Sequence, residues 1–341
     1  MWADRLAKLR RRPTAAPARP VGPTESLPAT AAVVLNYRAA EDTLRAVEAV
    51  RAGSVVPRLI VVDNGPADDA YRDLLARLGP DVDCLASGEN LGYAAGNNIG
   101  IRRALDAGAE FVWILNPDTE AEPSALRRLL RTAVARPDAG VLGPRILFPN
   151  RRIQFDGGTV DAARFGAPSH LNYGLRAKET PPAAEPIAVD YVNGASMLIR
   201  ADVLRSVGLL PEDYFLYFEE TAYCREVIAA GWTCLVDQRA RVVHHNRSRP
   251  GLPTVYYIYY MTRNRLRFAQ RYFDADPAAV LADWNTAFLD AWRGRVARDA
   301  PDWSATFEAI VHRAVADAAS GITGRVPEVE LIPHPDDGPE P

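Results

Sequence analysis

The chain has 341 residues, of which 48% are hydrophobic and 24% charged, and its formal net charge is -3. This near-balanced charge argues against a general nucleic-acid-binding protein, no apolar run is long enough to predict a membrane span, and the apolar content suffices for one large domain or two smaller ones. The three cysteines, Cys84, Cys224 and Cys234, are scattered without metal-ligand spacing, which favours a reducing, cytoplasmic setting over a secreted one.

The N-terminal segment, residues 1–29, is predicted to be disordered. It combines a short candidate helix, Trp2 to Arg12, with a linker rich in Ala, Pro and Arg, and it lacks the apolar stretch of a signal peptide. The basic residues from Lys8 to Arg12 fit a solvated tail, and contact with an anionic membrane surface is the alternative.

Between residues 30 and 140, buried strands alternate with helices. Strands are expected at 31–37, 59–65, 82–86 and 111–115, and helices at 41–52, 70–78 and 98–107. Such alternation predicts a parallel sheet with right-handed crossovers. Asn36, Asp63 and Asp118 each stand at or just beyond the end of a strand. Polar groups should therefore gather along the edge where open α/β sheets bind ligands.

The stretch from Phe111 to Glu120 is the most informative of these strand ends. Pro117 cannot donate a hydrogen bond to a sheet, so the strand must stop before it. Asp118, with Asn116 beside it, suits a hard cation bound to phosphate oxygens. The alternative is a turn in which an Asp or Thr caps the following helix, and this stretch alone does not decide between the two.

After residue 140 the pattern becomes mixed. Strands are expected at 141–148, 153–160, 233–236 and 241–245, and a loop is expected at 178–186. The apolar stretch 189–199 leads to a helix at 201–207, a second helix is expected through 225–229, and helices with breaks are expected from 254 to 319. We therefore divide the ordered chain into three parts and a tail. They are a half with alternating strands and helices at 30–140, a mixed half at 141–250, a C-terminal helical region at 251–324, and a flexible tail at 325–341.

Six short motifs carry a resemblance to a known family. In chain order they are Leu35-Asn36-Tyr37, Val61-Val62-Asp63-Asn64-Gly65, Glu89-Asn90-Leu91-Gly92-Tyr93-Ala94-Ala95-Gly96-Asn97-Asn98, Leu115-Asn116-Pro117-Asp118-Thr119, Asn193-Gly194-Ala195 and Phe218-Glu219-Glu220. The ordered set resembles the inverting family 2 glycosyltransferases of GT-A fold, in particular the bacterial rhamnosyltransferase-like branch. This resemblance implies a doubly wound, mostly parallel Rossmann-like sheet with mixed strands on the acceptor side, followed by C-terminal helices. It also implies that residues 30–140 are the nucleotide-sugar-binding half and that residues 141–250 are the acceptor-binding and catalytic half.

The resemblance also implies a set of nucleotide-sugar-binding residues: Asn36, Tyr37, Asp63, Asn64, Asn90, Gly92, Gly96, Asn97, Asn116, Asp118, Asn193, Gly194 and Arg263. Asp63 can accept a hydrogen bond from a pyrimidine N3–H, and this contact is compatible with an Asx turn. Gly92 and Gly96 are expected in a small-residue loop before a helix, where the backbone can approach a diphosphate; an ordinary helix N-cap is the alternative. Arg263 can meet a phosphate, although the aromatic run before it also fits a helix core.

A metal site and a catalytic base complete the expected machinery. Asn116-Pro117-Asp118 stands where the family has its Asp-x-Asp motif, so Asp118 and His244 are expected to hold Mg2+ or Mn2+ against the donor diphosphate. A strand-end histidine without a metal is the alternative. Glu219-Glu220 stands where relatives carry an acidic pair, and Glu220 is the expected base that deprotonates the acceptor; a helix-capping carboxylate is the alternative.

The sequence therefore predicts an inverting glycosyltransferase. It should transfer a sugar, with rhamnose as the leading candidate, from a dTDP- or UDP-linked donor to a hydroxyl of a glycan, a lipid-linked acceptor or a small molecule. A sugar-phosphate nucleotidyltransferase and a non-catalytic nucleotide-sugar-binding module are the alternatives. We expect a cytoplasmic protein without a nucleic-acid partner, and the sequence leaves open a peripheral contact with the inner face of the membrane and a homodimer.

Overall fold

The computed structural model describes residues 27–245, 251–330, 332 and 334, which form two compact units. Unit 1 contains residues 27–160, 168–211 and 220–245, and unit 2 contains 161–167, 212–219 and the described residues from 251 onward. The helix expected at Trp2 to Arg12 lies outside the described residues.

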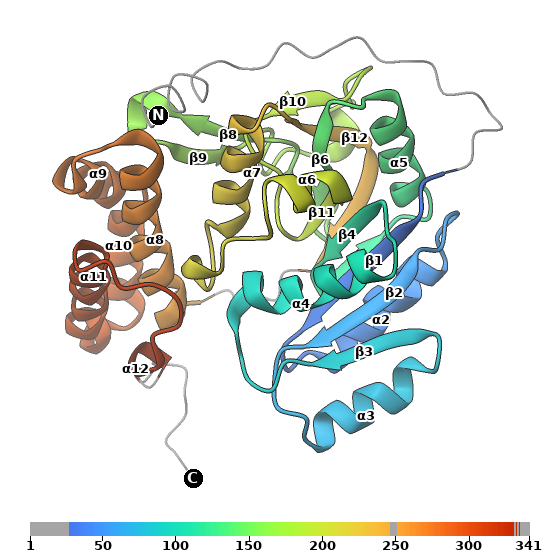
Figure 1. Ribbon diagram of the computed structural model, residues 1–341. Coiled ribbons are helices and arrows are strands. Elements are labelled where there is room, and N and C mark those ends of the chain that lie inside the picture. Colours follow the sequence, from blue (N-terminus) through green and yellow to red (C-terminus); the bar gives the residue numbers. More distant parts are fainter. Residues whose placement is uncertain (1–26, 246–250, 331, 333, 335–341) are drawn as a thin grey trace. The chain divides into compact units, whose positions relative to one another are not determined.

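Unit 1 is built on a ten-stranded sheet in the order β10-β12-β6-β11-β4-β1-β2-β3, with β5 beside β12 and β7 beside β6 (Figure 1). The strands of this sheet are β1 (Thr30–Asn36), β2 (Arg58–Asp63), β3 (Val82–Ala86), β4 (Phe111–Leu115), β5 (Thr119–Ala121), β6 (Ala139–Leu147), β7 (Ile153–Phe155), β10 (Ile187–Val189), β11 (Ser196–Arg200) and β12 (Thr233–His244). The first four strands pair in parallel, whereas β11 lies antiparallel between β4 and β6. A separate ribbon joins β8 (Gly158–Asp161) to β9 (Ala167–His170).

Helices cover both faces of this sheet. They are α2 (Ala40–Arg51), α3 (Asp69–Leu78), α4 (Gly92–Asp106), α5 (Ala125–Ala135), α6 (Ala201–Ser206) and α7 (Glu219–Ala229). Successive residues of β1 point to opposite faces: Val33 packs in one core cluster with Ile101 of α4, and Val34 packs in another with Val47 of α2. Both faces are therefore apolar, which confirms the predicted doubly wound, mostly parallel sheet.

The small-residue loop expected around Gly92 and Gly96 is instead helical, so that prediction was wrong. Helix α4 begins at Gly92, six residues earlier than expected. A Cβ atom on Gly96 would lie 2.6 Å from Leu35 Cδ1, and one on Gly100 would lie 2.4 Å from Val33 Cγ1. These glycines let α4 pack closely against β1, and this packing requirement, rather than an open loop, explains the small residues.

The second half of the sheet also shows three features that the sequence did not predict. Residues 189–199 run from the last residue of β10 through a loop into β11, and the two short strands expected at 233–245 are one strand with an irregularity between Asp237 and Arg241. The turn at Pro117 leads into β5, which pairs with β12 so that Thr119 lies opposite His244. This pairing brings the end of β12 beside Asp118.

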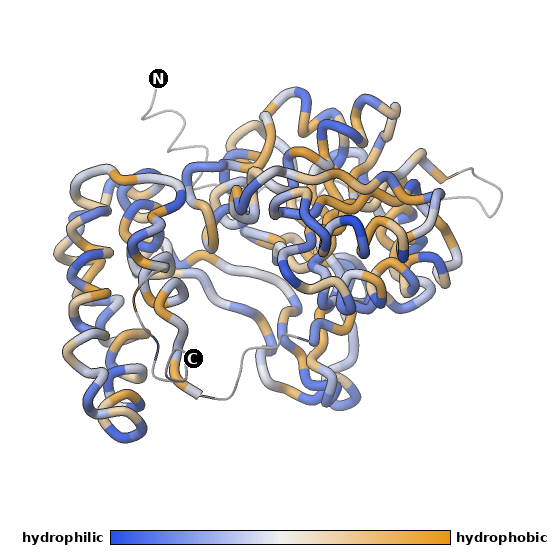
Figure 2. The backbone as a smooth tube through the Cα atoms, turned by 90° about the horizontal axis from the view of Figure 1, so that it is seen from below, coloured by the Kyte–Doolittle hydropathy of each residue, from blue (hydrophilic) through white to orange (hydrophobic). Residues whose placement is uncertain are grey.

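Unit 2 contains the C-terminal helices that the sequence predicts. They are α8 (Val255–Phe273), α9 (Pro277–Trp284), α10 (Asp290–Asp299), α11 (Ser304–Ala319) and α12 (Pro327–Glu330), with a π-helical turn at Asn285–Leu289. Apolar and hydrophilic positions alternate along these helices (Figure 2), and Tyr259 and Tyr260 of α8 are fully buried whereas Tyr256 is 43% exposed. Among the described residues, no helix has both the length and the apolar content that crossing a membrane requires.

Candidate functional site

Asn36 and Asp63 meet at the carboxyl ends of β1 and β2. The two residues are register partners, and Asn36 Nδ2 donates to Asp63 Oδ1 at 2.7 Å. Asn36 is itself held by Thr43, whose hydroxyl donates to Asn36 Oδ1 at 2.8 Å. Burial raises the pKa of the Asp63 carboxyl, the hydrogen bond from Asn36 opposes this rise, and the charge of Asp68 adds to it. Because Asn36 engages Oδ1, the orientation of the carboxylate is set before any ligand binds.

The asparagines that follow have structural partners. Asn64 Oδ1 accepts the Leu91 N–H at 3.0 Å, and Asn64 Nδ2 donates to Asn90 Oδ1 and to the Gly92 carbonyl, each at 3.1 Å. Asn90 Oδ1 also accepts the Gly92 N–H at 3.0 Å. Asn64 and Asn90 therefore shape the turn that starts α4. Asn97 is fully buried and donates to the Tyr93 carbonyl.

The burial of Gly96 and Asn97 corrects their assignment as ligand contacts. Gly96 packs against Leu35 and the Asn64 side chain, and Asn97 has no exposed surface. Tyr37 differs, since it is 42% exposed where β1 ends and is free to lie against a ligand.

The loop at Asn193 and Gly194 is tied to the ends of β4 and α4. The Tyr93 hydroxyl donates to the Gly194 carbonyl at 2.6 Å, and the Asn116 N–H donates to the Ala195 carbonyl at 3.0 Å. Asn193 Oδ1 accepts the Ala195 N–H, which closes the turn within the loop. Tyr93 was not predicted to have a role, although it stands within one of the six motifs.

Two of the predicted site residues, Asp118 and His244, lie side by side in unit 1. His244 Nε2 lies 3.0 Å from Asp118 Oδ1, and the two side chains are 11% and 19% exposed. Burial acts to raise the pKa of the Asp118 carboxyl, but the hydrogen bond and the charge of His244, with His245 contributing further, bring that pKa below its ordinary value. The neighbouring His245 instead approaches Glu120 Oε1 at 2.9 Å.

Gln154 on β7 orients the His244 ring through a contact with its Nδ1 atom. His244 Nδ1 lies 3.0 Å from Gln154 Oε1, and because this oxygen can only accept, the Nδ1–H group donates to it. His244 Nε2 then faces the Asp118 carboxylate, so either a proton on Nε2 or a cation must lie between the two atoms.

The strand that carries Gln154 is itself firmly anchored. Arg145 on β6 donates to both carboxylate oxygens of Asp156, at 2.7 and 2.8 Å, and both side chains are fully buried. Such a bidentate pair fixes direction as well as distance. The sequence gives no signal for Gln154, because a single glutamine in a short strand is equally compatible with an exposed position.

Asp118 and His244 fit a divalent cation that is partly held by a ligand. Within the described ranges, no cluster of three or more His, Cys, Asp or Glu side chains could hold a metal ion by itself. A carboxylate oxygen and an imidazole nitrogen supply two donors of the kind that Mg2+ and especially Mn2+ accept. Diphosphate oxygens, water and the partly exposed Asn116 can supply the others.

The segment before α7, in unit 2, adopts an unusual backbone. Phe215, Tyr217 and Phe218 have positive φ values of 67°, 67° and 74°. Left-handed conformations at bulky residues are costly and persist only when the surroundings impose them. Here Asn264 of α8 imposes them, since its Nδ2 donates to the carbonyls of Tyr214, Leu216 and Tyr217 at 2.8 to 3.0 Å.

This segment leads directly into the two candidate carboxylates. Glu219 is 4% exposed, whereas Glu220 is only partly buried. Burial of the carboxyl group raises the pKa of Glu220 to about 6, and hydrogen bonds from the backbone N–H groups of Glu220 and Thr221 oppose that rise. A carboxylate with a pKa of about 6 is ionised at neutral pH and can accept a proton, which is what the predicted role of Glu220 as a base requires.

Arg263 is not placed to bind a phosphate, and this corrects its assignment. It has no exposed surface, and its guanidinium group donates to the carbonyls of Tyr214 and Gly324 at 2.9 and 2.8 Å and to Asn264 Oδ1 at 3.0 Å. It also lies 4.8 Å from the centre of the Tyr260 ring. The helix-core alternative, which was weighed for the aromatic run before Arg263, holds for Tyr260 and is wrong for Tyr256, which is 43% exposed.

Comparison with known proteins adds independent information. Residues 31–201 match the family model described as Glycosyl transferase family 2. The chain is 30% identical over 266 residues, 76% of its length and 81% of the relative's, to the low-salt glycan biosynthesis hexosyltransferase Agl10 of Haloferax volcanii. It is also 30% identical, over 57% of its length and 68% of the relative's, to the N-acetylglucosaminyl-diphospho-decaprenol L-rhamnosyltransferase of Mycobacterium tuberculosis.

Two solved structures share the fold. A mannosyltransferase, PcManGT, from Pyrobaculum calidifontis in complex with GDP-Man and Mn2+ superposes with a TM-score of 0.54 and 16% identity, over 93% of each chain. GalNAc-T7 with UDP, GalNAc and Mn2+ superposes with a TM-score of 0.57 and 15% identity, over 87% of this chain and 58% of that one. Both likenesses support the GT-A arrangement of the sheet.

Proposed function

This chain belongs to glycosyl transferase family 2 and is a glycosyltransferase of GT-A fold, and we propose that it transfers one sugar, with inversion, from a dTDP- or UDP-linked donor to an acceptor hydroxyl. The observation that carries this proposal is the Asp118–His244 pair at the end of β12, in the same sheet that presents Asp63 at the end of β2. One sheet therefore carries both the Asp63 carboxylate, which is proposed to contact the nucleobase, and the Asp118–His244 pair, which is proposed to face the diphosphate.

The donor nucleotide is proposed to be a uridine or thymidine diphosphate. A carboxylate such as Asp63 accepts from the N3–H of uracil or thymine, whereas the N3 of cytosine is itself an acceptor and is repelled. Asn36 holds one oxygen of Asp63, so the other can face the base. The exposed Tyr37 is available to contact the ring. Rhamnose is the proposed sugar, by similarity to the mycobacterial rhamnosyltransferase.

Asp118 and His244 are the residues that would hold Mg2+ or Mn2+ against the donor diphosphate. When bound, such a cation neutralises the charge that develops on the leaving nucleoside diphosphate. Gln154 keeps the His244 proton on Nδ1 and thereby leaves Nε2 free to coordinate. The two solved neighbours named above contain Mn2+, which supports the choice of metal.

Glu220 is the proposed base. The acceptor oxygen attacks the anomeric carbon while its proton passes to the Glu220 carboxylate, and the bond to the diphosphate oxygen breaks on the opposite face of the sugar. With a pKa of about 6, Glu220 is ionised at neutral pH and is a stronger base than an ordinary glutamate. The acceptor is proposed to be a hydroxyl of a glycan, a lipid-linked saccharide or a small molecule.

A nucleotide-sugar screen tests this proposal. We expect one dTDP- or UDP-sugar, with Mg2+ or Mn2+, to raise the melting temperature and to release nucleoside diphosphate slowly in the absence of acceptor, because a ligand that binds only the folded state stabilises it. Asp118→Asn should abolish this release while the unliganded protein melts as before. Asp69→Asn is the matched control, because its side chain is 97% exposed on α3. Full turnover in excess chelator would refute the metal assignment, and no response to any nucleotide sugar would refute the donor class.

A further inference from the structure

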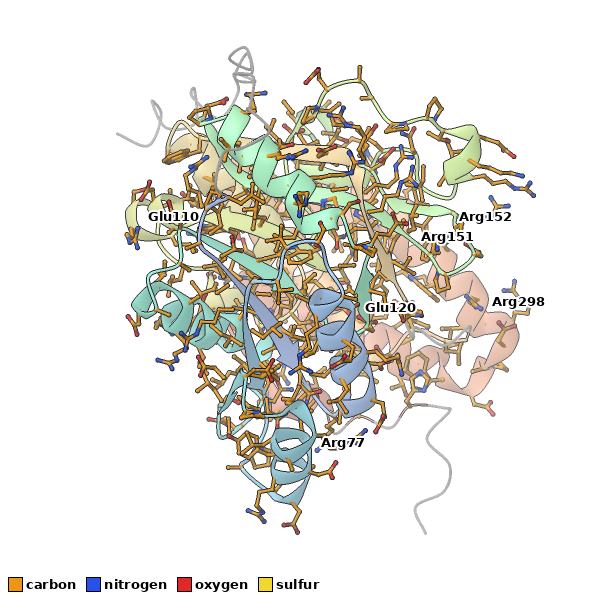
Figure 3. All side chains as sticks on the ribbon, turned by 90° about the vertical axis from the view of Figure 1, so that its right-hand side faces the viewer. Arg77, Glu110, Glu120, Arg151, Arg152 and Arg298 are labelled. Carbon is orange, nitrogen blue, oxygen red and sulfur yellow. The ribbon has the colours of Figure 1, made fainter. Side chains whose placement is uncertain are left out.

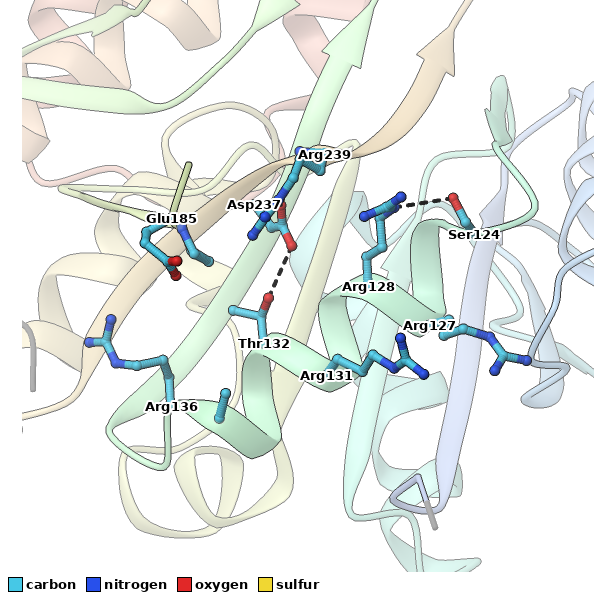
Figure 4. Close-up of a pocket in the computed structure, with 11 residues that line it drawn as sticks. Ser124, Arg127, Arg128, Arg131, Thr132, Arg136, Glu185, Asp237 and Arg239 are labelled. Atoms are coloured by element: carbon cyan, nitrogen blue, oxygen red, sulfur yellow. Dashed lines mark hydrogen bonds and ion pairs between the residues drawn. The ribbon is translucent and has the colours of Figure 1, made fainter. Parts of the chain in front are cut away.

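A second polar site lies on the α5 face of unit 1. It is a hollow of about 340 Å³ lined by α5, by the irregular part of β12 and by the segment before β10 (Figure 4). Five of its eleven lining residues are arginines, namely Arg127, Arg128, Arg131, Arg136 and Arg239, against two acids, Glu185 and Asp237. The hollow shares no residue with the site described above. Arg239 stands five residues before His244, roughly 15 Å along the same strand.

Two of these arginines, Arg128 and Arg131, have no carboxylate partner among the described residues, and a third, Arg239, shares its partner Asp237 with other donors. Arg131 has no hydrogen bond or ion pair within the described part of the chain, and Arg128 contacts only the Ser124 hydroxyl, at 3.4 Å. Arg239 approaches Asp237 Oδ1 at 3.3 Å, but that oxygen also accepts the Arg239 N–H, and Oδ2 accepts the buried Thr132 hydroxyl. Several exposed guanidinium groups around one hollow repel each other, and an anion between them relieves that repulsion.

The other two arginines are already engaged. Arg136 forms two hydrogen bonds to Asp138, at 2.9 and 2.7 Å, and Arg127 donates to Ser54. Asp138 balances the charge of Arg136, and Ser54 holds Arg127 in place. Arg128 and Arg131 are exposed and lie three residues apart in the sequence, which places them on the same side of α5.

The residues that line the hollow indicate which kind of anion it can bind. No aromatic side chain is present to stack on a base, so the hollow does not match a nucleoside. Guanidinium forks match the paired oxygens of a phosphate group, and the row along α5 opens outward. We propose that this arginine hollow binds the phosphate groups of anionic phospholipids and docks unit 1 on a membrane surface.

Vesicle sedimentation with the full-length protein tests the proposal. The wild type should bind vesicles of phosphatidylcholine mixed with phosphatidylglycerol and should not bind phosphatidylcholine alone. The triple variant Arg128→Gln/Arg131→Gln/Arg239→Gln should lose on the order of 100-fold in partitioning. Arg72→Gln/Arg77→Gln/Arg205→Gln removes the same charge from exposed positions on α3 and α6, where Figure 3 shows Arg77, and should bind like the wild type. The basic N-terminal segment is common to all three proteins, so it cannot cause a difference between them.

The single variant Arg131→Gln covers the case in which the triple variant does not fold, because Arg131 has no partner to lose in the described structure. It should reduce partitioning about fivefold. Equal vesicle binding by the wild type and the hollow variants would overturn the proposal, as would an equal loss in both triple variants. Calorimetry with inorganic phosphate distinguishes a free phosphate ligand from a lipid headgroup. Phosphate binding that depends on Arg131, without vesicle binding, would show that the ligand is a free anion and would also overturn the membrane assignment.

Discussion

Replacing Glu220 by glutamine tests the assignment of the base with little change in side-chain size. Glutamine keeps most of the packing and hydrogen bonding but cannot accept a proton as a carboxylate does. If Glu220 deprotonates the acceptor, the variant should bind donor and acceptor as the wild type does and transfer the sugar about 10²–10⁴-fold more slowly. The assay is steady-state release of nucleoside diphosphate with acceptor present, and calorimetry with donor provides the binding control.

The pKa of Glu220 gives this prediction a second, independent signature. With a pKa of about 6, half of the molecules carry the reactive carboxylate at pH 6, and about one tenth carry it at pH 5. Because the ionised form is the base, kcat/KM should rise with pH, about fivefold from pH 5 to 6 and about twofold more up to pH 8. In Glu220→Gln this rise should disappear.

Two further variants sharpen the result. Glu219→Gln should reduce the transfer rate less than Glu220→Gln does, because Glu219 is buried and adjacent residues at the start of a helix point in different directions. Glu220→Asp shortens the arm by one methylene and should retain measurable activity if the acceptor can approach more closely. Transfer by Glu220→Gln within a few-fold of the wild type, or an unchanged pH midpoint, would refute the reasoning, and Glu219 would then be the next candidate.

Three other outcomes follow from contacts described above. Asp63→Ala should weaken nucleoside diphosphate binding by roughly 1.5–3 kcal/mol, the worth of one hydrogen bond to a charged group, and unchanged affinity by calorimetry would limit Asp63 to a role in the turn. Gln154→Leu should lower Mn2+ affinity, measured by paramagnetic resonance with nucleoside diphosphate present, by about 10- to 100-fold, whereas Gln154→Glu keeps the acceptor and should lose less. Asn264→Asp keeps the shape but removes the donors to three carbonyls, so urea unfolding should show a loss of roughly 1–3 kcal/mol; equal stability would show that the left-handed segment supports itself.

Most strands of the sheet could be predicted because the sequence patterns that mark them lie within a few residues of each other. Each apolar run that ends in a polar residue identifies a strand and its direction, and parallel strands bring their carboxyl ends to one edge. Asn36 and Asp63 therefore meet as expected. The partnership of Asp118 with His244 followed only from the family resemblance, because no local pattern predicts that β5 pairs with β12.

What could not be predicted depends on packing. A glycine serves a flexible loop or a close helix contact equally well, so the burial of Gly96 against Leu35 was missed. An arginine in an aromatic run can face phosphate or backbone carbonyls, and only the position of the Tyr214 carbonyl decides for Arg263. Gln154 is uncharged and lies in no recognisable sequence motif, so only the three-dimensional structure reveals its contact with His244.

The hydrogen bonds between Asn264 and the segment before Glu219 have a consequence for building chimeric enzymes. The family model ends at residue 201, so a natural crossover for exchanging acceptor specificity would fall after it, between α7 and α8. Such a crossover would join Tyr214, Leu216 and Tyr217 to a foreign α8. Unless the donor of the new helix also carries an amide at the Asn264 position, the hybrid should keep its sheet and nucleotide affinity yet transfer poorly, because the backbone entering Glu220 would relax.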